Sequence, residues 1–259
     1  MAYRNPAFIS RHYGAEVGVA AITSSVAAAA GFGKERLIDY RLGNNFKFST
    51  VAAGHWVEFD LGALGGVAVN RLIMPAGHNL VGITINTKSG ASSPATTSRG
   101  STNAGAGLSD FTLTESTDRY WRIEFGVAAS DDWEMPELWL GRYRQTTTGI
   151  VQSWEAPWLS PVVRREFPSR ESMLVTAPAR RRWELEHKGL TGTDLAIYDE
   201  LLPLGVGVPF WFYPPDDAVT GPLLMLLEDD GDREQDHPVP NGAAGPSYEV
   251  SLAMREQTS

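Results

Sequence analysis

The sequence predicts a mainly β protein, with an N-terminal β-sandwich and a C-terminal β-rich α+β module that carries one short helix. The first observation is an alternation of apolar and polar residues in His55–Leu61 and Arg119–Phe125, which is typical of half-buried strands. The second is the glycine-rich turns between such segments, such as LGALGG at 61–66. The third is one strong helical segment, Thr191–Leu202. Together these observations predict a sandwich over residues 1–143, a linker over 144–161 and the second module over 162–259.

The sandwich begins with residues 15–30, AEVGVAAITSSVAAAA, which only loosely resemble a secretory signal because Glu16 opens the apolar run and hydroxyl residues interrupt it. We therefore expect this segment to be an ordered part of the first domain. Further strands of the sandwich are expected at Val69–Met74, Gly82–Thr87, Phe111–Glu115 and Glu137–Leu140.

Residues 88–110 (KSGASSPATTSRGSTNAGAGLSD) consist almost entirely of small residues, with Leu108 as the only large apolar one. A long segment of this composition predicts a surface loop, which is either solvated or in contact with a partner. If it contacts a ligand or partner, Lys88 and Arg99 are the candidate residues.

The expected linker holds two tryptophans, Trp154 and Trp158. Large aromatic side chains are costly to leave in water, so we expect these two residues to lie in an interface, either between the domains or with another chain.

The second module again alternates at Arg182–His187, where His187 falls on the inward face and is expected to be a structural, hydrogen-bonded histidine. The helix at 191–202 follows, with Thr191 or Thr193 available as its cap. Three further strands are expected in this module, at Pro209–Tyr213, Leu223–Leu227 and Ser247–Arg255.

The composition excludes several classes of function. The 259 residues carry 22 Lys and Arg against 31 Asp and Glu, a formal net charge of −9, which argues against nucleic acid as the main partner. No cysteine is present, so disulfides and thiolate chemistry are excluded. No run of residues is long and apolar enough to predict a membrane span.

No motif for catalysis, metal binding or cofactor binding is found. The five histidines do not stand in metal-ligand spacing, and no nucleophile elbow, P-loop or dinucleotide fingerprint occurs. Glu228–Asp236 (EDDGDREQD) is acidic but lacks the order of a calcium loop, so Asp230-Gly231 predicts a hairpin turn, while a calcium site there stays open. We therefore expect no catalytic residues, metal or cofactor, and a protein that is not an enzyme.

Two stretches resemble known families. Residues 36–80, with the segments LIDYR, WVEFDLG and VNRLIMPAGHNL, and residues 119–141 resemble galactose-binding-like (discoidin-type) jelly rolls. The resemblance implies a jelly-roll sandwich that binds sugars, lipids or proteins through loops at one end, or that is purely architectural.

Residues 160–259 resemble the tail-tube and distal-tail proteins of long-tailed bacteriophages, through RRRWELEHKGLT, GVPFWFYPPDD and SYEVSLAMRE. This resemblance implies a structural subunit of a phage tail tip or baseplate, located in the virion and made in the host cytoplasm. Such a subunit would form a homo-oligomeric ring, a hexamer or a trimer, that contacts tail-tube and tail-hub proteins. The alternative is a carbohydrate-binding module that recognises a host-surface glycan or acts as a lectin.

Overall fold

The fold is described from a computed structural model. It describes residues 5–50, 52–126, 133–147, 150–155, 158–159, 162–166, 172–176, 180–215, 221–228, 232–235 and 248–257. Between 150 and 176, and in 232–235, it describes the backbone only.

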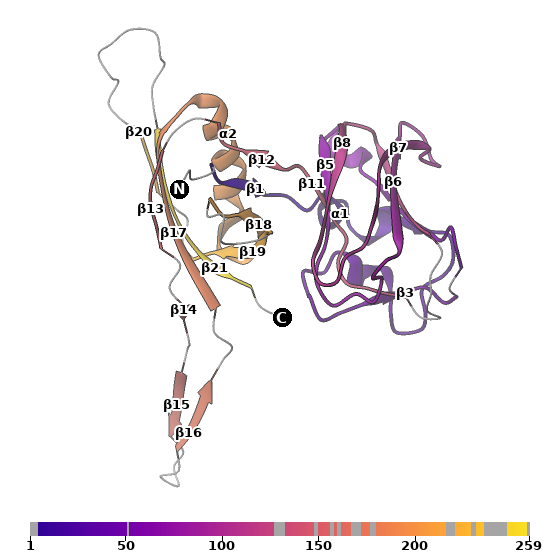
Figure 1. The fold of residues 1–259 in the computed structure, drawn as a ribbon, viewed down its shortest axis with the longest axis horizontal. Coiled ribbons are helices and arrows are strands. Elements are labelled where there is room, and N and C mark those ends of the chain that lie inside the picture. The colour runs from indigo at the N-terminus through magenta and orange to yellow at the C-terminus, as the bar shows by residue number, and fades with distance from the viewer. Residues whose placement is uncertain are drawn as a thin grey trace. The chain divides into compact units, whose positions relative to one another are not determined.

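The described chain is mainly β, as the sequence predicts (Figure 1). Its strands and α-helices are β1 (Ala7–Ile9), α1 (Tyr13–Val17), β2 (Ile22–Ser24), β3 (Phe46–Lys47), β4 (Trp56–Asp60), β5 (Val69–Met74), β6 (Thr84–Gly90), β7 (Thr97–Asn103), β8 (Ser109–Ser116), β9 (Tyr120–Phe125), β10 (Glu134–Met135), β11 (Trp139–Gly141), β12 (Arg144–Gln145), β13 (Ile150–Glu155), β14 (Trp158–Leu159), β15 (Val162–Glu166), β16 (Ser172–Thr176), β17 (Arg180–Leu190), α2 (Gly192–Leu201), β18 (Phe210–Tyr213), β19 (Leu223–Leu227), β20 (Asp232–Gln235) and β21 (Tyr248–Glu256).

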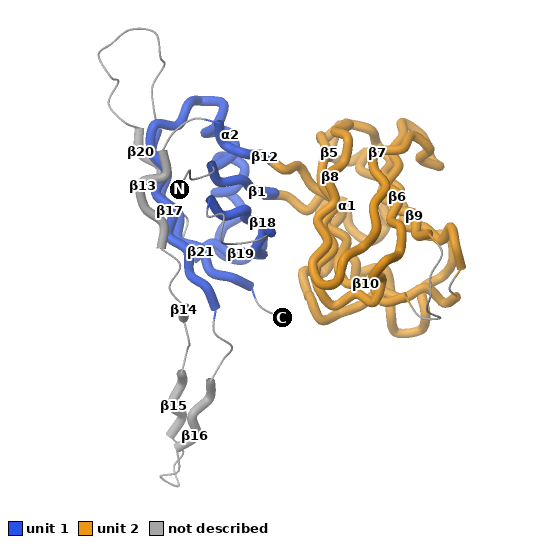
Figure 2. Tube along the Cα trace, in the orientation of Figure 1, with its two compact units in different colours: residues 1–10, 144–258 blue, residues 11–143, 259 orange. Residues whose placement is uncertain are grey.

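The chain divides into two compact units (Figure 2). One unit comprises residues 11–143, and the other combines residues 1–10 with 144–258. This grouping differs from the expected boundaries because β1 pairs with β18, far along the chain, and with β12 directly after the sandwich. The first unit is thus inserted between two neighbouring strands of the second. Residues 144–161, expected to be a linker, contain β12, β13 and β14, which pair with β1 and β17.

The inserted unit is a sandwich of antiparallel sheets. One sheet has the strand order β2-β4-β9-β6-β7, and the other has the order β11-β5-β8, while β3 and β10 form a small additional pair. The alternation in the sequence explains the two central strands. Val57 and Phe59 of β4 and Ile123 of β9 are fully buried, because every second residue of a strand points to the same face.

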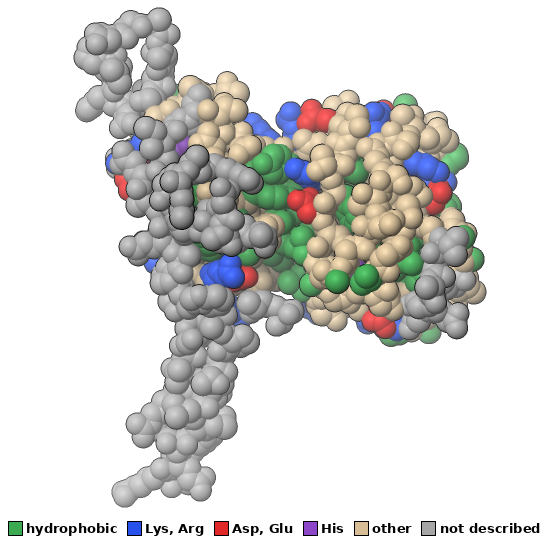
Figure 3. Space-filling model, in the orientation of Figure 1, with side chains coloured by type: hydrophobic (Ala, Val, Ile, Leu, Met, Phe, Trp, Pro, Cys, Tyr) green, Lys and Arg blue, Asp and Glu red, His purple; other side chains and the backbone are tan. Residues whose placement is uncertain are grey.

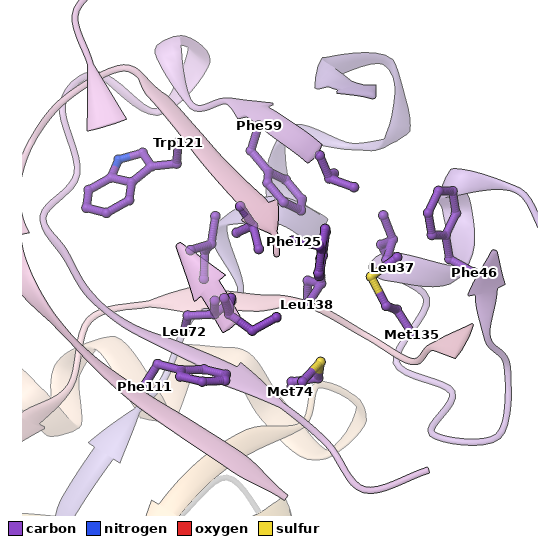
Figure 4. Close-up of a cluster of buried hydrophobic side chains, with 14 of the residues drawn as sticks. Leu37, Phe46, Phe59, Leu72, Met74, Phe111, Trp121, Phe125, Met135 and Leu138 are labelled. Atoms are coloured by element: carbon purple, nitrogen blue, oxygen red, sulfur yellow. The ribbon is translucent and has the colours of Figure 1, made fainter. Parts of the chain in front are cut away.

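The core of the sandwich is filled by aromatic and aliphatic side chains from both sheets and from the segments between them (Figure 4). Phe59, Trp121 and Phe125 come from the five-stranded sheet, while Leu72 and Phe111 come from the three-stranded sheet. Burial of this apolar surface, worth about 25 cal/mol per Å², is the main force that holds the two sheets together.

The expectation of a loop over residues 88–110 is wrong. The segment contains the end of β6, all of β7 and the start of β8. Thr97–Asn103 carries no apolar alternation because β7 is the outermost strand of its sheet and buries little of its surface. Serine and threonine are tolerated there, since an edge strand needs backbone pairing on one side rather than a buried face.

The second unit contains a sheet with the order β12-β1-β18-β19-β21-β17-β13. The strands β19 and β20 both pair with β21, in succession along its length. The chain therefore continues in the same direction from β19 to β20, and the hairpin expected at Asp230-Gly231 is not formed between these strands, although the two turn residues themselves lie outside the described ones.

The predicted helix is α2, Gly192–Leu201, whose buried residues Leu195, Tyr198 and Leu201 belong to the core of the second unit. Thr191 is the N-cap residue, but its side chain makes no cap hydrogen bond. His187 is fully buried, and its Nδ1 lies 2.8 Å from Tyr198 Oη, which confirms its expected structural role.

The strands β15 and β16 form a two-stranded antiparallel sheet in the register Val162↔Thr176 to Glu166↔Ser172. Within the described chain they pair with no other strand. A two-stranded hairpin is at best marginally stable alone in water, so this segment requires further contacts to be stable.

Candidate functional site

The structure places the two basic candidates, Lys88 and Arg99, in strands rather than in a loop. Lys88 lies in β6, and its Nζ donates to Glu124 Oε2 on the adjacent β9 at 2.7 Å. The other two candidates, Trp154 and Trp158, lie in β13 and β14, and their side chains are outside the described part of the structure.

Arg99 connects the edges of the two sheets. It is the extra residue of a bulge, because Thr87 pairs with Gly100 while Lys88 pairs with Ser98. Its Nη2 donates to Ser116 Oγ on β8 at 3.0 Å and to Asp118 Oδ2 at 2.7 Å. Hydrogen bonds from Ser89 and Arg99 lower the pKa of Asp118, so this carboxylate stays ionised and anchors the guanidinium.

A hollow of about 260 Å³ lies between these two edges. The strands β7 and β8 are each the last strand of their sheet, and no described strand pairs with their outer sides. Edge strands expose unpaired backbone N–H and C=O groups, so this region offers main-chain donors and acceptors to a ligand. The hollow is lined by Ile85, Thr87, Gly100, Ser101, Thr102, Asp110, Phe111, Thr112 and Leu113.

The lining has an apolar, buried part and a polar, exposed rim. Phe111 and Leu113 are each 5% exposed, whereas Ser101 and Thr112 are exposed. Gly100 brings the β7 backbone close to β8, since a Cβ atom there would lie 3.1 Å from Leu113 Cδ2. The hollow therefore combines hydroxyl groups with a small apolar surface.

Thr87 is the unusual residue of this lining. It is 1% exposed, and among the described residues its Oγ1 has no hydrogen-bond partner. Buried hydroxyls are normally paired, because leaving one unpaired costs about 1–3 kcal/mol. An unpaired hydroxyl in the wall of a hollow is therefore suited to a bound ligand or an ordered water.

Among the described residues that line the hollow, the only charged side chain is that of Asp110, whose Oδ1 lies 3.9 Å from Arg71 Nε. The face of the inserted sandwich that is visible in Figure 3 is likewise mostly uncharged, and its acidic and basic side chains lie in small separate groups. The hollow is thus polar but nearly neutral.

The outer face of the five-stranded sheet carries a separate polar network around Glu58. This carboxylate is 2% exposed and accepts hydrogen bonds from Ser93 Oγ at 2.6 Å, Ala95 N at 2.8 Å and Arg122 Nε at 3.0 Å. The Arg122 guanidinium also lies 3.9 Å from the centre of the Trp56 ring. Every one of these contacts is internal, so we interpret Glu58 as the residue that fixes the segment between β6 and β7 on the sheet.

A third cluster is buried beside α1. His12 stacks on Trp139 with ring centres 4.5 Å apart, and its Nε2 lies 3.4 Å from Glu137 Oε1. Burial lowers the pKa of His12 to about 3 and raises the pKa of Glu137 to about 8, so both groups are neutral near pH 7. Both side chains are fully buried and neither lines the hollow, so we interpret this cluster as structural.

Within the described residues, no group of three or more His, Asp or Glu side chains could hold a metal ion. Glu228, at the start of the acidic segment, accepts a hydrogen bond from Arg182 Nε at 2.6 Å, and residues 229–231 lie outside the described part. In the described residues, no helix is long and apolar enough to cross a membrane.

Sequence reasoning missed the hollow because its residues are small, polar and spread over three strands. Two features of the sequence could have revealed it. Thr87 is a polar residue at a strand position that faces inward, and Gly100 permits close approach of two backbones.

No protein-family model and no curated protein matches the chain. Among solved structures, a chitosan-binding module of a chitosanase/glucanase from Paenibacillus sp. IK-5 is 22% identical, with a TM-score of 0.41, and the match covers 47% of this chain and 93% of the module.

Two further neighbours are also carbohydrate-binding modules. The family 32 module of AlyQ, in complex with 4,5-unsaturated mannuronic acid, is 26% identical with a TM-score of 0.35. The match covers 46% of this chain and 92% of the module. The family 32 module of NanJ from C. perfringens, in complex with galactose, is 12% identical with a TM-score of 0.39. The match covers 54% of this chain and 99% of the module. These similarities extend over about half of the chain, and the sandwich assignment rests on the strand order described above.

Proposed function

We propose that the chain is a binding protein whose inserted sandwich binds carbohydrate. The observation that carries this proposal is the hollow between β7 and β8, with hydroxyl side chains around an apolar floor that includes Phe111. Sugars present hydroxyl groups at their edges and C–H groups on their ring faces. A site for them combines hydrogen-bonding groups with apolar contact, as the general anatomy of small-ligand pockets also requires.

The polar rim can exchange hydrogen bonds in both directions. The hydroxyls of Thr102 and Thr112 can each donate one hydrogen bond and accept others, as sugar hydroxyls do, while Ser101 Oγ, which donates to Asn86 Oδ1 at 2.6 Å, can accept one. The proposal concerns binding, because the lining offers no pair of titratable groups placed for proton transfer.

A glycan array probed with the full-length protein tests this function. We expect binding to one class of glycan and loss of that binding on competition with the free sugar. The R119E variant is a suitable control, because Arg119 pairs with Asp60 on the exposed surface and does not line the hollow. Absence of binding to any glycan or polysaccharide would contradict the proposal.

A second candidate function is favoured by the hairpin β15–β16. Its strands pair with each other and with no other described strand, as expected for a segment that docks on another chain. We propose, as this second candidate, a structural subunit of a phage tail tip or baseplate. It would form a ring in the virion, between the tail tube and the host-recognition components, and the inserted sandwich would then serve as a host-glycan binder on that ring.

Measurement of the particle mass tests this second candidate. We expect multiples of 28.2 kDa, three or six copies, at micromolar concentration. Deletion of residues 162–176 would then give a lower mass with the sandwich still folded. A protein that stays monomeric at all concentrations, and also in the presence of tail-tube and tail-hub proteins, would contradict it.

A further inference from the structure

The size and polarity of the hollow define its ligand more narrowly. Its volume of about 260 Å³ lies just below the range of about 300–1,000 Å³ that is typical of pockets for drug-sized ligands. It therefore suits a single sugar ring rather than a longer stretch of a glycan held along its whole length. The rest of a glycan chain would continue into solvent past the exposed rim at Ser101 and Thr112.

The charges around the hollow disfavour an ionised sugar. Asp110 is the charged residue among the described lining residues, and it already lies beside Arg71. A carboxylate on the ligand would be repelled by Asp110, and burial of a charge without a partner is strongly unfavourable. An ammonium group would have to compete with Arg71, since the floor offers no second carboxylate.

Thr87 supplies the selective contact. Thr87 is a lining residue of the hollow, and its Oγ1 is buried and has no hydrogen-bond partner among the described residues. A buried polar group that is unpaired without ligand favours ligands that form a hydrogen bond with it. Analogues that lack the hydrogen-bonding group bind more weakly, because the buried group then stays unpaired.

We propose that the hollow receives one uncharged sugar ring, and that Thr87 Oγ1 forms a hydrogen bond with one ring hydroxyl and determines which sugar is accepted. This inference rests on the proposed carbohydrate-binding function and specifies its ligand class. Arg99 acts as a positioning residue, because its contacts to Ser116 and Asp118 hold β7 against β8 beside the hollow.

Titration calorimetry with individual sugars tests this inference. The probes are the methyl glycosides of glucose, galactose and mannose, with methyl glucuronide and glucosamine as the charged counterparts. We expect one of the neutral glycosides to bind most tightly, since the charged sugars meet the unfavourable surroundings of Asp110.

The T87V variant removes the hydroxyl and keeps the shape of the side chain. We expect it to weaken binding of the preferred glycoside about tenfold, which corresponds to about 1.4 kcal/mol, while the melting temperature stays unchanged or rises. T87S restores the hydroxyl and should bind like the wild type. T114V, on an exposed position of β8 outside the lining, is the matched control and should bind normally.

A measurement on the wild type keeps the test independent of any folding defect in T87V. The preferred glycoside should shift the amide NMR signals of residues 100–102 and 110–113. If a glycan binds but these signals do not shift, if T87V folds and binds normally, or if a charged sugar binds most tightly, the inference is wrong while carbohydrate binding stands. If none of these sugars binds although the glycan array detects binding, the inference is likewise wrong and carbohydrate binding stands. If the array detects no binding either, both proposals fall.

Discussion

His12 and Glu137 form a buried pair in which His12 Nε2 and Glu137 Oε1 are 3.4 Å apart, with no exposure of either side chain. The backbone N–H of Tyr40 also donates to Glu137 Oε1 at 3.3 Å, and Tyr40 has a positive φ of 58°, which is uncommon for a residue with a large side chain. Glu137, two residues before β11, thus binds the backbone of a residue in a strained conformation.

The stability of the sandwich should depend on pH in a way set by this pair. The pKa of His12 falls from 6.5 to about 3 on burial, so the unfolded state binds more protons and stability decreases as the pH falls below 6.5. The pKa of Glu137 rises from 4.5 to about 8, so the unfolded state releases its proton first and stability decreases as the pH rises from 4.5 to 8. The two effects oppose each other between pH 4.5 and 6.5. The free energy of unfolding, measured with urea from pH 4 to 9, should be nearly constant between pH 4.5 and 6.5 and should decrease on both sides of this range.

Glu137→Gln isolates the alkaline part of this dependence. The variant cannot ionise, so its free energy of unfolding should no longer decrease between pH 6.5 and 8. At pH 8 it should exceed that of the wild type by at least about 1 kcal/mol. Parallel curves for variant and wild type over this range would show that Glu137 does not retain its proton in the folded state.

Glu58→Gln should destabilise the sandwich by about 3 kcal/mol. The substitution removes the carboxylate from a buried ion pair and leaves Arg122 without its partner. Hydrogen exchange of the Ala95 amide, which donates to Glu58, should become faster. Asp60→Asn on the same strand is the matched control, because its pair with Arg119 is exposed and should contribute less than about 1 kcal/mol. Equal effects of the two substitutions would contradict the assigned role of Glu58.

Tyr198→Phe should destabilise the second unit by about 1 kcal/mol. It removes the hydroxyl that lies 2.8 Å from His187 Nδ1, and leaves a fully buried imidazole with one hydrogen bond fewer. Leu195→Ala on the same helix should cost about 2–5 kcal/mol, because it opens a cavity in the core. Thermal unfolding followed by circular dichroism measures both, and a Tyr198→Phe variant as stable as the wild type would exclude a structural role for this hydrogen bond.

The sequence predicts those parts of the fold whose residues bury one face. The alternation in β4 and β9 and the apolar side of α2 identify their elements, because burial imposes a period of two or of about 3.6 residues. By contrast, β7 was missed, since an edge strand made of threonine, serine and glycine buries no stripe of side chains.

Two further features could not be predicted because they depend on contacts between distant residues. β1 has only three residues, and its place beside β18 follows from pairing with a segment about two hundred residues away. His12 and Glu137 are likewise far apart in sequence, and neither stands in a recognisable motif. The lining of the hollow, which includes Thr87, Gly100 and Asp110, joins strands from two different sheets, which a period within one strand does not reveal.

The insertion of the sandwich has a consequence for how such a protein can change. The chain leaves β1 and returns in β12, and these strands are hydrogen-bonded neighbours through Phe8↔Arg144. A guest domain with adjacent ends can be exchanged as a cassette, since the host sheet needs no rearrangement to accept another one. Recombination at these two junctions would replace the whole sandwich in one genetic step and leave the strand pairing of the second unit unchanged.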